Sequence, residues 1–354
     1  MTNQTLSFIL FITLFSCMPA KGQVNYRVMF YNVENLFDTV DDPLKDDNEF
    51  LPAGNRRWTP KRYYHKLNQI AKVIHAAGEW ETPALIGLCE VENDTVLHHL
   101  LSRTSLRHMD YRYCVTASQD NRGMNVALLY QRDKFRYINH TGYQVRFTSK
   151  RQKSTRDILH AWGEILSGDT LDLLINHFPS RYGGEKESEK GRLDAAFTLK
   201  RIADSLCLIR KNPLLIIMGD FNDEPTDKSI REVLNACPLS GPDPSSRNHF
   251  SPDGLYNLIP QKNKMHITGT HKYQGSWAQL DQIILNGRWF EPSSSLQVKP
   301  GSCRIFTPDF LFIADRTWKG IRPKRTFHGF RYEGGYSDHL PLITDFLLYL
   351  SSQP

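Results

Sequence analysis

The chain has 354 residues, a length that suits one large α/β domain. Hydrophobic residues make up 40% of the sequence and charged residues 23%, which supplies enough apolar surface for a core and excludes a wholly disordered chain. The formal net charge of +6 suits an anionic substrate without requiring one. The sequence has no internal repeats, heptads or low-complexity tract, which excludes solenoids and coiled coils.

The first 22 residues differ in composition from the rest. An apolar run from Ser7 to Ser16 is too short to span a bilayer comfortably, and the small residues Ala20 and Gly22 follow it. This pattern is typical of a secretory signal peptide, so we expect residues 1–22 to be removed and 23–354 to form one exported domain without a transmembrane helix. Two other interpretations are a lipoprotein signal and a buried N-terminal helix. The expected location is periplasmic, extracellular or lipid-anchored through Cys17.

The six cysteines are widely scattered. None has Cys-x-x-Cys spacing, which argues against a zinc knuckle or a redox motif. Cys89 lies in an apolar run, and we interpret it as a small core residue.

Apolar runs separated by turn residues predict strands interleaved with helices. The predicted elements of the first half are a strand at 27–31, a surface loop at 38–55, a helix at 60–78, a strand from Pro83 to Glu90, a helix capped by Asp94 that runs to about Arg103, and strands at 123–130, 157–166 and 170–176. Pro60 suits the first turn of its helix and Gly78 suits the stop. The last two strands are joined by a Gly168-Asp169 turn.

The second half continues the same pattern. Its predicted elements are a long helix at 185–210, a strand at 214–218, a short helix at 229–236, loops across 241–276, a strand at 279–285, an irregular segment at 286–330 and a last strand after His339. Helices that alternate with strands in this way favour a layered α/β fold.

One stretch combines a buried strand with a cluster of polar side chains. The uncharged run from Leu214 to Met218 is followed at once by Gly219, Asp220, Asn222 and Asp223. Open α/β sheets bind ligands at such strand ends. Taken alone, the stretch could equally be an Asx-rich turn after a core strand.

The same arrangement recurs at other buried strands. Polar side chains follow four of the strands and precede or begin two others: Asn32, Glu90, His177, and Asp220 with Asn222 follow theirs, whereas Asp281, and Asp338 with His339, stand at the start. One pocket collects all of them if strands of both directions meet at one edge. The pattern therefore predicts a mixed sheet with a site at that edge.

The residue types in this set indicate a chemistry. Glu90, Asp220 and Asn32 offer hard oxygen ligands, which Mg²⁺ prefers, whereas no zinc-type cysteine or histidine set occurs. His177 and His339 could transfer protons or donate to a phosphate oxygen. Asp281 is a candidate partner that orients His339, and Arg181 could hold a phosphate through two hydrogen bonds.

Each of these residues also has a structural interpretation. Asn32 could be a turn residue, Glu90 could cap the following helix, and His177 could be a satisfied core histidine. Ser337, Asp338 and His339 cannot form a serine triad, because neighbouring side chains point apart in extended backbone. The sequence also lacks the Gly-x-Ser-x-Gly elbow that a nucleophilic serine needs.

The motifs together resemble those of the endonuclease/exonuclease/phosphatase superfamily, which includes deoxyribonuclease I. The resemblance extends from about Tyr26 to Leu348 and departs from the family where Cys89 replaces the glutamine of many members. The motifs that carry it are Phe30-Tyr-Asn32-Val-Glu34-Asn35, Ile86-Gly-Leu-Cys-Glu90, Asn176-His177-Phe-Pro-Ser-Arg181, Gly219-Asp220-Phe-Asn222, Leu280-Asp281-Gln-Ile-Ile and Ser337-Asp338-His339-Leu-Pro.

The resemblance implies a four-layer α/β/β/α sandwich of two mixed sheets, with the site at one sheet edge. It implies that Glu90 binds Mg²⁺ or Mn²⁺ with Asn32 and Asp338 nearby, and that His339, held by Asp281, assists the attacking water or stabilises phosphate charge. Asp220 and Asn222 would then orient the nucleophile and the phosphate. His177 would be the histidine of deoxyribonuclease I-like members. The implied reaction is metal-assisted hydrolysis of a phosphoester in one step, without a covalent intermediate.

Several functions use this scaffold. A secreted nuclease, monomeric and acting on nucleic acid, is the favoured interpretation, because basic residues could track phosphates: Arg151, Lys153, Arg156, Lys186, Lys190 and Arg192. A phosphoesterase of phospholipids or inositol phosphates is the alternative, with residues 306–312 as an apolar lip for membranes. A non-catalytic surface binding protein is the alternative of another class. A calcineurin-type phosphatase is excluded, since its Asp-x-His and Gly-Asn-His-Glu motifs are missing.

Overall fold

The computed structural model describes residues 23–149, 154–239, 250–261 and 263–350. The predicted signal peptide with Cys17 lies outside the described residues, as do Arg151 and Lys153. Within the described ranges, no helix has both the length and the apolar character that spanning a bilayer requires.

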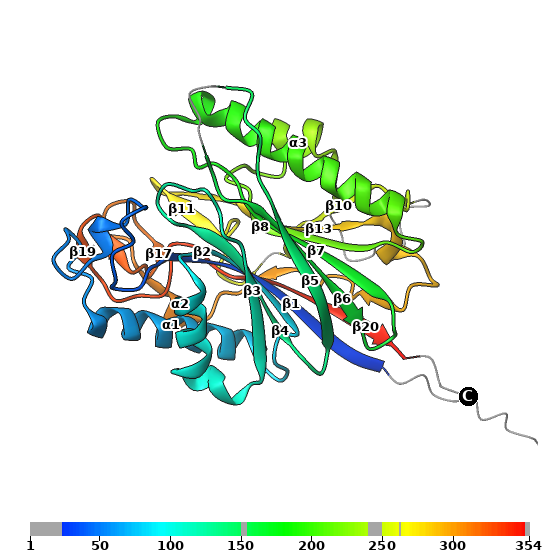
Figure 1. Ribbon diagram of the computed structural model, residues 1–354, viewed down its shortest axis with the longest axis horizontal. Coiled ribbons are helices and arrows are strands. Elements are labelled where there is room, and N and C mark those ends of the chain that lie inside the picture. The colour runs from blue at the N-terminus through cyan, green and yellow to red at the C-terminus, as the bar shows by residue number, and fades with distance from the viewer. Residues whose placement is uncertain (1–22, 150–153, 240–249, 262, 351–354) are drawn as a thin grey trace, which may run out of the picture.

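Two mixed β-sheets pack face to face, and helices cover their outer faces (Figure 1). Helix α3 (Glu185–Ile209) lies on one side of the sheets, whereas α1 (Pro60–Gly78) and α2 (Asp94–Ser102) lie on the other. This arrangement confirms the predicted four-layer α/β/β/α sandwich with strands of both directions in each sheet.

The first sheet, sheet A, has the strand order β14-β20-β1-β2-β4-β3, with β15 also paired to β20. Its strands are β1 (Gln23–Leu36), β2 (Leu85–Val91), β3 (Tyr111–Val115), β4 (Asn125–Gln131), β14 (Leu296–Val298), β15 (Arg304–Ile305) and β20 (Leu342–Tyr349). Only β1 and β2 are parallel in this sheet. Their carboxyl ends therefore meet at one edge.

The second sheet, sheet B, has the order β5-β6-β7-β8-β13-β10-β9. Its strands are β5 (Phe135–Tyr143), β6 (Ile158–Ile165), β7 (Thr170–His177), β8 (Leu214–Asp220), β9 (Ala236–Leu239), β10 (Leu255–Leu258) and β13 (Asp281–Asn286). Strands β7 and β8 are parallel, and β13 is antiparallel to β8. The start of β13 thus lies at the same edge as the ends of β7 and β8.

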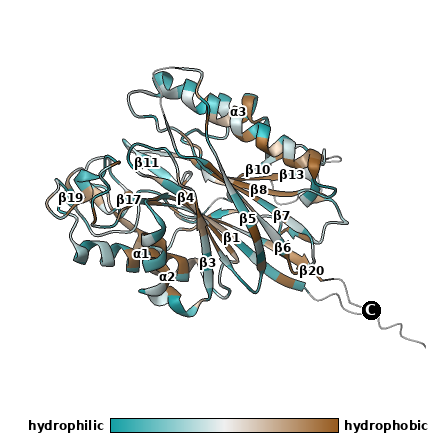
Figure 2. Cartoon of the chain, in the orientation of Figure 1, coloured by the Kyte–Doolittle hydropathy of each residue, from teal (hydrophilic) through white to brown (hydrophobic). Residues whose placement is uncertain are grey.

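The uncharged run of β8 is explained by burial on both faces. Side chains alternate between the faces of a strand, so Ile216 and Met218 pack between the two sheets while Leu215 and Ile217 pack under α3. Figure 2 shows the same division, with apolar residues concentrated in the strands and on the inner sides of the helices.

The two sheets approach each other closely where Met218 faces Gly87. A Cβ atom at Gly87 would lie 2.9 Å from the sulfur of Met218 and 3.0 Å from the ring of Phe30. Only glycine leaves room for both neighbours, and its small size therefore lets β1, β2 and β8 pack closely here.

The helix predictions agree with the structure except at two places. Helices α1 and α3 occupy the predicted ranges, and α2 begins at Asp94. The residue that caps α2 is Asn93 rather than Asp94, because the Asn93 side chain accepts a hydrogen bond from Val96 N at 3.0 Å. The predicted helix at 229–236 is wrong: a single π-helical turn (Ser229–Val233) precedes strand β9.

Segments expected to be irregular contain short strands. In the described part of the chain, three two-stranded hairpins stand outside the main sheets: β11 (His271–Tyr273) with β12 (Ser276–Ala278), β16 (Phe312–Ala314) with β17 (Ile321–Pro323), and β18 (Phe327–His328) with β19 (Arg331–Tyr332). Short 3₁₀ turns occur at Asn48–Phe50, Ser105–His108, Gly287–Phe290 and Asp309–Leu311. The first hairpin lies beside the candidate site, as described below.

Candidate active site

Three candidate residues of sheet B lie side by side at one edge. The strand register pairs His177 at the end of β7 with Asp220 at the end of β8, and pairs Asp220 with Asp281 at the start of β13. Neighbouring strands are about 4.8 Å apart, so paired residues bring their side chains within reach of one another. The direction and register of the three strands therefore place His177, Asp220 and Asp281 in one row.

Two candidate residues of sheet A face this row. Asn32 in β1 pairs with Cys89 in β2, next to Glu90, where a register shift interrupts the β1–β2 and β2–β4 pairings. Glu90 has a positive φ of 62°, and its carboxylate accepts hydrogen bonds from Asn35 N at 2.8 Å and from Asn32 Nδ2 at 3.2 Å. The bulge turns Glu90 away from the strand and toward the row on sheet B.

Asp220 lies at the centre of the cluster. Its Oδ1 accepts from the Asn222 N–H at 2.9 Å and its Oδ2 accepts from Asn32 Nδ2 at 3.0 Å. The same Oδ2 lies 3.6 Å from His177 Nε2 and 3.7 Å from His339 Nε2. Burial raises the pKa of Asp220, partly offset by the positive charge of His339.

His339 is held by a carboxylate. Its Nδ1 lies 2.7 Å from Asp281 Oδ2, which leaves Nε2 directed toward Asp220. Burial opposes the charged ring, but the carboxylates of Asp281 and Asp220 outweigh that cost and raise the pKa of His339 well above its usual value. The surroundings of His339 therefore favour the charged form of its ring.

His177 has the opposite environment. Its side chain is 3% exposed, and its Nδ1 is buried without a hydrogen-bond partner. Burial, reinforced by the positive charge of Arg156, lowers the pKa of His177 well below its usual value. His177 is therefore neutral at neutral pH, although Glu90 Oε1 lies 3.9 Å from its Nε2.

Asp338 lies at the more open side of the cluster, next to a histidine that the sequence did not single out. Asp338 Oδ2 is 3.9 Å from His271 Nε2 and 4.0 Å from an Arg325 guanidinium nitrogen. Burial would raise the pKa of Asp338, but the charges of His339 and Arg325 outweigh it and lower that pKa. Burial, reinforced by His339, lowers the pKa of His271 to about 3.

The backbone around Gly-Asp-Phe-Asn explains its residue types. A Cβ atom at Gly219 would lie 2.4 Å from the backbone oxygen of Asn176, so glycine is needed for close packing of β7 on β8 and not for a turn. Asn222 adopts the positive φ of 49° that turns the chain after β8. Its amide donates to Phe178 O at 3.1 Å, which fixes the side chain beside the site.

Arg181 is bound by protein groups. It donates to Asn222 O at 2.7 Å, and its guanidinium lies 2.8 Å from Asp227 and 3.3 Å from Asp223. The predicted role in phosphate binding requires that the guanidinium exchange one of these partners for the substrate. In the structure Arg181 instead holds the loop that carries Asn222.

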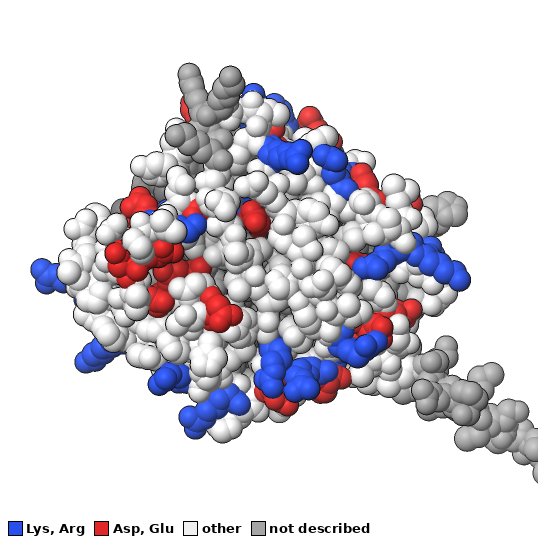
Figure 3. Space-filling model, viewed as in Figure 1, with Lys and Arg blue, Asp and Glu red and all other residues white. Residues whose placement is uncertain are grey.

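Other residues of the predicted phosphate track are also engaged. Arg192 is buried and donates to Asp223 at 2.6 Å, so its expected place on the surface is wrong. Arg156 is buried as well, and donates to Phe178 O at 2.7 Å beneath His177. Figure 3 shows Lys and Arg distributed mostly around the periphery of one face, with a group of acidic residues left of its centre and no continuous basic track on this face.

The hydroxyl of Ser337 makes hydrogen bonds to the backbone and is not placed as a nucleophile. Its hydroxyl donates to Asn32 O at 2.7 Å and accepts from His339 N at 3.1 Å. It thereby joins the loop before β20 to β1. The exclusion of a serine triad agrees with this geometry.

A buried lysine joins helix α1 to the segment that precedes β20. Lys66 Nζ donates to Thr326 Oγ1 and Tyr336 O, both at 2.6 Å, and lies 3.9 Å from Glu34 Oε2. Glu34 in turn accepts from Thr326 N at 2.7 Å. Sequence reasoning missed Lys66, whose only signal is a single cation on the apolar stripe of α1.

Glu90 and Asp338 have the most exposed side chains among the acidic residues of the cluster, and carboxylate oxygens are the donors that a hard divalent cation prefers. The side chains of Glu90 and Asp338 are 17% and 24% exposed, whereas that of Asp220 is 2% exposed. Asn32 directs its amide nitrogen at Glu90 and Asp220, and its oxygen accepts from Glu34 N at 2.9 Å, so in this rotamer it organises the carboxylates. Two carboxylates at an open side leave room for the waters that Mg²⁺ and Mn²⁺ retain.

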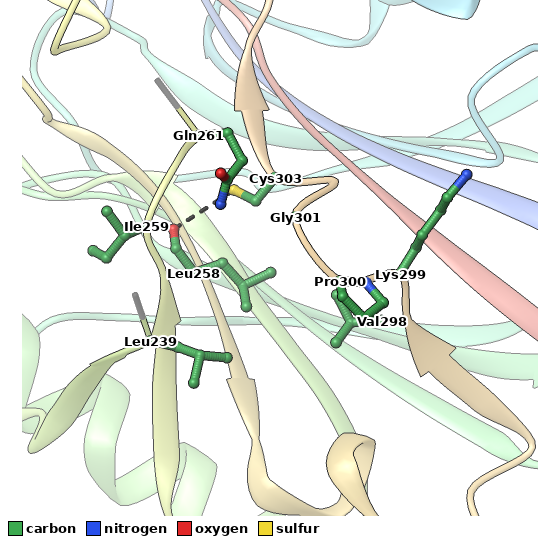
Figure 4. A pocket seen from close by; sticks show the side chains of 9 residues that line it. All are labelled: Leu239, Leu258, Ile259, Gln261, Val298, Lys299, Pro300, Gly301 and Cys303. Atoms are coloured by element: carbon green, nitrogen blue, oxygen red, sulfur yellow. Dashed lines mark hydrogen bonds between the residues drawn. The ribbon is translucent and has the colours of Figure 1, made fainter. Parts of the chain in front are cut away.

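A small apolar pocket elsewhere is not the active site. It has a volume of about 30 Å³, enough for a water molecule or two, and Figure 4 shows that Gln261 and Cys303 line it together with aliphatic residues. Cys303 Sγ lies 3.6 Å from Leu258 O in this pocket. Its lining residues are Leu239, Leu258, Ile259, Gln261, Val298, Lys299, Pro300, Gly301 and Cys303.

Comparison with known families identifies the class. Residues 27–347 match the model of the endonuclease/exonuclease/phosphatase family, so the chain belongs to this family. A divalent-metal-dependent phosphoesterase is the class of enzyme that this membership and the cluster of carboxylates and histidines define. No curated protein matches the chain in sequence.

Solved structures show the same fold at low sequence identity. An endonuclease/exonuclease/phosphatase family protein from Bacteroides thetaiotaomicron has a TM-score of 0.53 and 16% identity, covering 93% of this chain and 100% of its own. A mannosyl-6-phosphatase of the same organism has a TM-score of 0.53 and 17% identity, covering 91% and 99%. The human nocturnin catalytic domain with bound sulfate has 0.50 and 18%, covering 92% and 96%.

Proposed function

We propose that the protein is an exported, Mg²⁺- or Mn²⁺-dependent phosphodiesterase that cleaves nucleic acid by direct attack of water. The observation that carries the proposal is the approach of His177 and His339 to the buried carboxylate of Asp220, at 3.6 and 3.7 Å, in surroundings that raise the pKa of His339 and lower the pKa of His177. Groups of opposite protonation state on two sides of one site are suited to acid and base roles.

Each residue has a definite task in the proposed reaction. A divalent ion held by Glu90 and Asp338 would supply Lewis-acid stabilisation of phosphate charge. Asp220, whose pKa burial raises, would orient the attacking water and accept its proton as the oxygen–phosphorus bond forms.

The remaining groups act on the phosphate. His339 would donate a hydrogen bond or a proton to a phosphate oxygen, and Asp281 would keep it charged. Neutral His177 and the amide of Asn222 would position the phosphate. The ester bond to the leaving oxygen would then break, that oxygen would take up a proton from water and leave as an alcohol, and no covalent bond to the protein would form.

Two exposed aromatic residues, Tyr273 and Trp318, form what we call the rim of the site, and they support a nucleic-acid substrate. On hairpin β11–β12, Tyr273 lies two residues beyond His271 and therefore on the same face, about 7 Å further along the strand. Tyr273 is 67% exposed, and Trp318 beside the hairpin turn is 53% exposed. A Cβ atom at Gly275 in that turn would lie 3.2 Å from Trp318 Cβ. Exposed aromatic rings next to a phosphate site are suited to stacking of bases.

The rim is fixed to the catalytic strands by a buried cation. Lys272, on the other face of β11, donates to Asp315 at 2.9 Å and to the backbone oxygens of Lys319 and Ile321 at 3.1 and 3.0 Å. The loop that carries Trp318 is thus joined to the strand that carries His271. An anchored rim can select substrates without closing over them.

The alternative lipid substrate has less support. The apolar lip expected at 306–312 is largely internal, since Phe306 is 9% exposed and Leu311 is 2% exposed. Phe310 packs against Tyr336 and beneath the ammonium of Lys72. A phosphorylated sugar or inositol remains the second candidate, because a mannosyl-6-phosphatase shares the fold.

The substrate class can be tested with one panel. The purified protein would be incubated with Mg²⁺ and plasmid DNA, single-stranded DNA or RNA, and in parallel with sphingomyelin vesicles, an inositol phosphate and mannose 6-phosphate. We expect cleavage of nucleic acid that EDTA abolishes. Turnover of only the lipid or sugar substrates would reject the nucleic-acid proposal and retain the phosphoesterase. Export would be tested separately, by locating the protein in cell fractions.

A further inference from the structure

Strand β11 brings a third histidine into the site. His271 forms an isolated backbone bridge with His339, and the two ring centroids are 4.7 Å apart at an interplanar angle of 36°. His271 Nε2 lies 3.9 Å from Asp338 Oδ2. One ligand atom from each of His271, Asp338 and His339 lies within 4.8 Å of the other two. The backbone bridge fixes the spacing of the two histidines.

These spacings are close to those around a small metal ion. Two ligand atoms at about 2.1 Å from zinc are about 3.4 Å apart at a tetrahedral angle and at most about 4.2 Å apart. The 3.9 Å between His271 and Asp338 lies within that range. The third ligand atom lies within 4.8 Å of the other two.

The hydrogen bonding behind the histidines has the form found around metal ligands. Metal-binding histidines usually direct their second ring nitrogen at a carboxylate or a carbonyl. His339 does so, since its Nδ1 lies 2.7 Å from Asp281 Oδ2. Asp281 thus leaves Nε2, which lies 3.7 Å from Asp220 Oδ2, as the ring nitrogen that can bind a metal.

The donor set differs from that of the magnesium site. Two imidazole nitrogens and one carboxylate suit Zn²⁺ and the later first-row metals, whereas Mg²⁺ prefers oxygen donors. We propose that His271, Asp338 and His339 form a second cation site that takes Zn²⁺ in preference to Mg²⁺. The guanidinium of Arg325, 4.0 Å from Asp338, is the protein cation that the metal displaces from this carboxylate.

Occupation of this site has a consequence for catalysis, which rests on the proposed function. The bound ion engages Asp338, which the magnesium site also uses. It also engages Nε2 of His339, which the proposed reaction uses to donate to the phosphate. Zn²⁺ therefore inhibits the hydrolysis that Mg²⁺ supports, and the metal content of the surroundings regulates the enzyme. His271 is the residue that separates the two sites, because it belongs only to the second.

Zinc binding can be measured without a substrate. Zn²⁺ is titrated by calorimetry into the purified protein with Mg²⁺ in large excess, using wild type, His271→Asn and, as control, His75→Asn, which changes an exposed histidine on α1. We expect one equivalent of Zn²⁺ to bind wild type and the control, and to bind His271→Asn about tenfold more weakly or not at all. Equal binding by wild type and His271→Asn overturns the site, and so does absence of binding to wild type.

Two further readouts separate the site from the proposed function. The visible absorption of bound Co²⁺ should change in His271→Asn because a nitrogen ligand is lost, and an unchanged spectrum counts against the assignment. The Zn²⁺ concentration that halves Mg²⁺-supported activity should rise about tenfold in the same variant. Zinc binding that depends on His271 in a protein that hydrolyses no phosphoester would retain the site and reject the proposed function.

Discussion

The two histidines of the site, at the end of β7 and before β20, both direct Nε2 at Asp220 but differ in the groups around the rest of the ring. His339 has a carboxylate at each ring nitrogen, with Asp281 at 2.7 Å and Asp220 at 3.7 Å. His177 has a buried Nδ1 without a partner and a buried guanidinium, that of Arg156, nearby. The first environment favours the imidazolium and the second favours the neutral ring.

This difference shows how one sheet edge can hold two histidines whose surroundings favour different charge states. The strand register places a carboxylate between the two rings, and the loops behind each ring decide its charge. A second buried pair, His160 with Asp172 at 2.8 Å, lies on the outer face of sheet B beneath α3 and offers a comparison outside the site. The four predictions that follow test the contrast, from the largest expected effect to the smallest.

Removal of the cationic ring should have the largest effect. In His339→Ala we expect phosphodiester hydrolysis to fall by about a hundred- to ten-thousandfold, because both the positive charge and the proton donor are lost. The measurement is kcat/KM with saturating Mg²⁺. His160→Ala is the matched control, since it removes another buried His–Asp bond and should lower the melting temperature without lowering the rate comparably. Similar rate losses in both variants would contradict the assignment.

Removal of the neutral ring should cost less and should be partly reversible. His177→Ala is expected to lose about a hundredfold in kcat/KM. His177→Gln should recover part of that loss, because a neutral amide can still hydrogen-bond to the phosphate. His339→Gln should recover little, because it cannot carry charge. Equal recovery at both positions would show that the two rings do not differ in charge.

The interaction between Asp281 and His339 can be weakened directly by a substitution at Asp281. Asp281→Asn should lower activity about ten- to a hundredfold, as loss of a supporting hydrogen-bond partner does. Because Asp281 raises the pKa of His339, activity in wild type should persist above pH 7 and decline only where His339 loses its proton. In Asp281→Asn that decline should move to lower pH. A pH–rate profile whose alkaline limb does not move would contradict the assigned role.

The smallest effect is expected at the rim, away from both rings. Trp318→Ala should raise KM for an oligonucleotide by roughly five- to a hundredfold, since stacking of one base contributes about 1–3 kcal/mol. Trp80→Ala, which removes a fully exposed tryptophan just after α1, is the control and should leave KM unchanged. An unchanged KM in Trp318→Ala would remove the rim from the proposal.

The sequence predicted the strands that carry the site because those strands are buried on both faces. A continuous apolar run of strand length, such as the one in β8, predicts a buried strand when turn residues bound it. The predicted mixed sheet followed from polar residues at both ends of strands, and the pairing of Asp281 with Asp220 confirms it. The bond between Asp281 and His339 also agrees with the prediction.

Edge strands and hairpins escaped prediction for a different reason. Strand β5 lies at the edge of sheet B and exposes most of its residues, so its sequence lacks a hydrophobic pattern. Strand β11 is three residues long and owes its position to the bridge with His339 and to Lys272. The signal for it was the Gln274-Gly275 turn, where both residues have positive φ, as hairpin turns of two residues require.

The charges were misjudged where their partners are distant in sequence. Arg192 was expected to track phosphates, yet it is buried against Asp223, 31 residues later in the chain. Arg181 likewise binds Asp227, 46 residues later. A sequence shows which residues are charged, whereas the fold decides which charges are already neutralised and which can meet a substrate.

The most direct test uses a small substrate whose hydrolysis does not depend on stacking against the rim. Hydrolysis of bis(4-nitrophenyl) phosphate would be measured beside that of the monoester 4-nitrophenyl phosphate, with Mg²⁺, with EDTA, and in His339→Ala. We expect hydrolysis of the diester to exceed that of the monoester, to stop with EDTA and to fall at least a hundredfold in the variant. Hydrolysis that persists in EDTA, that His339→Ala leaves intact, or that favours the monoester would contradict the account.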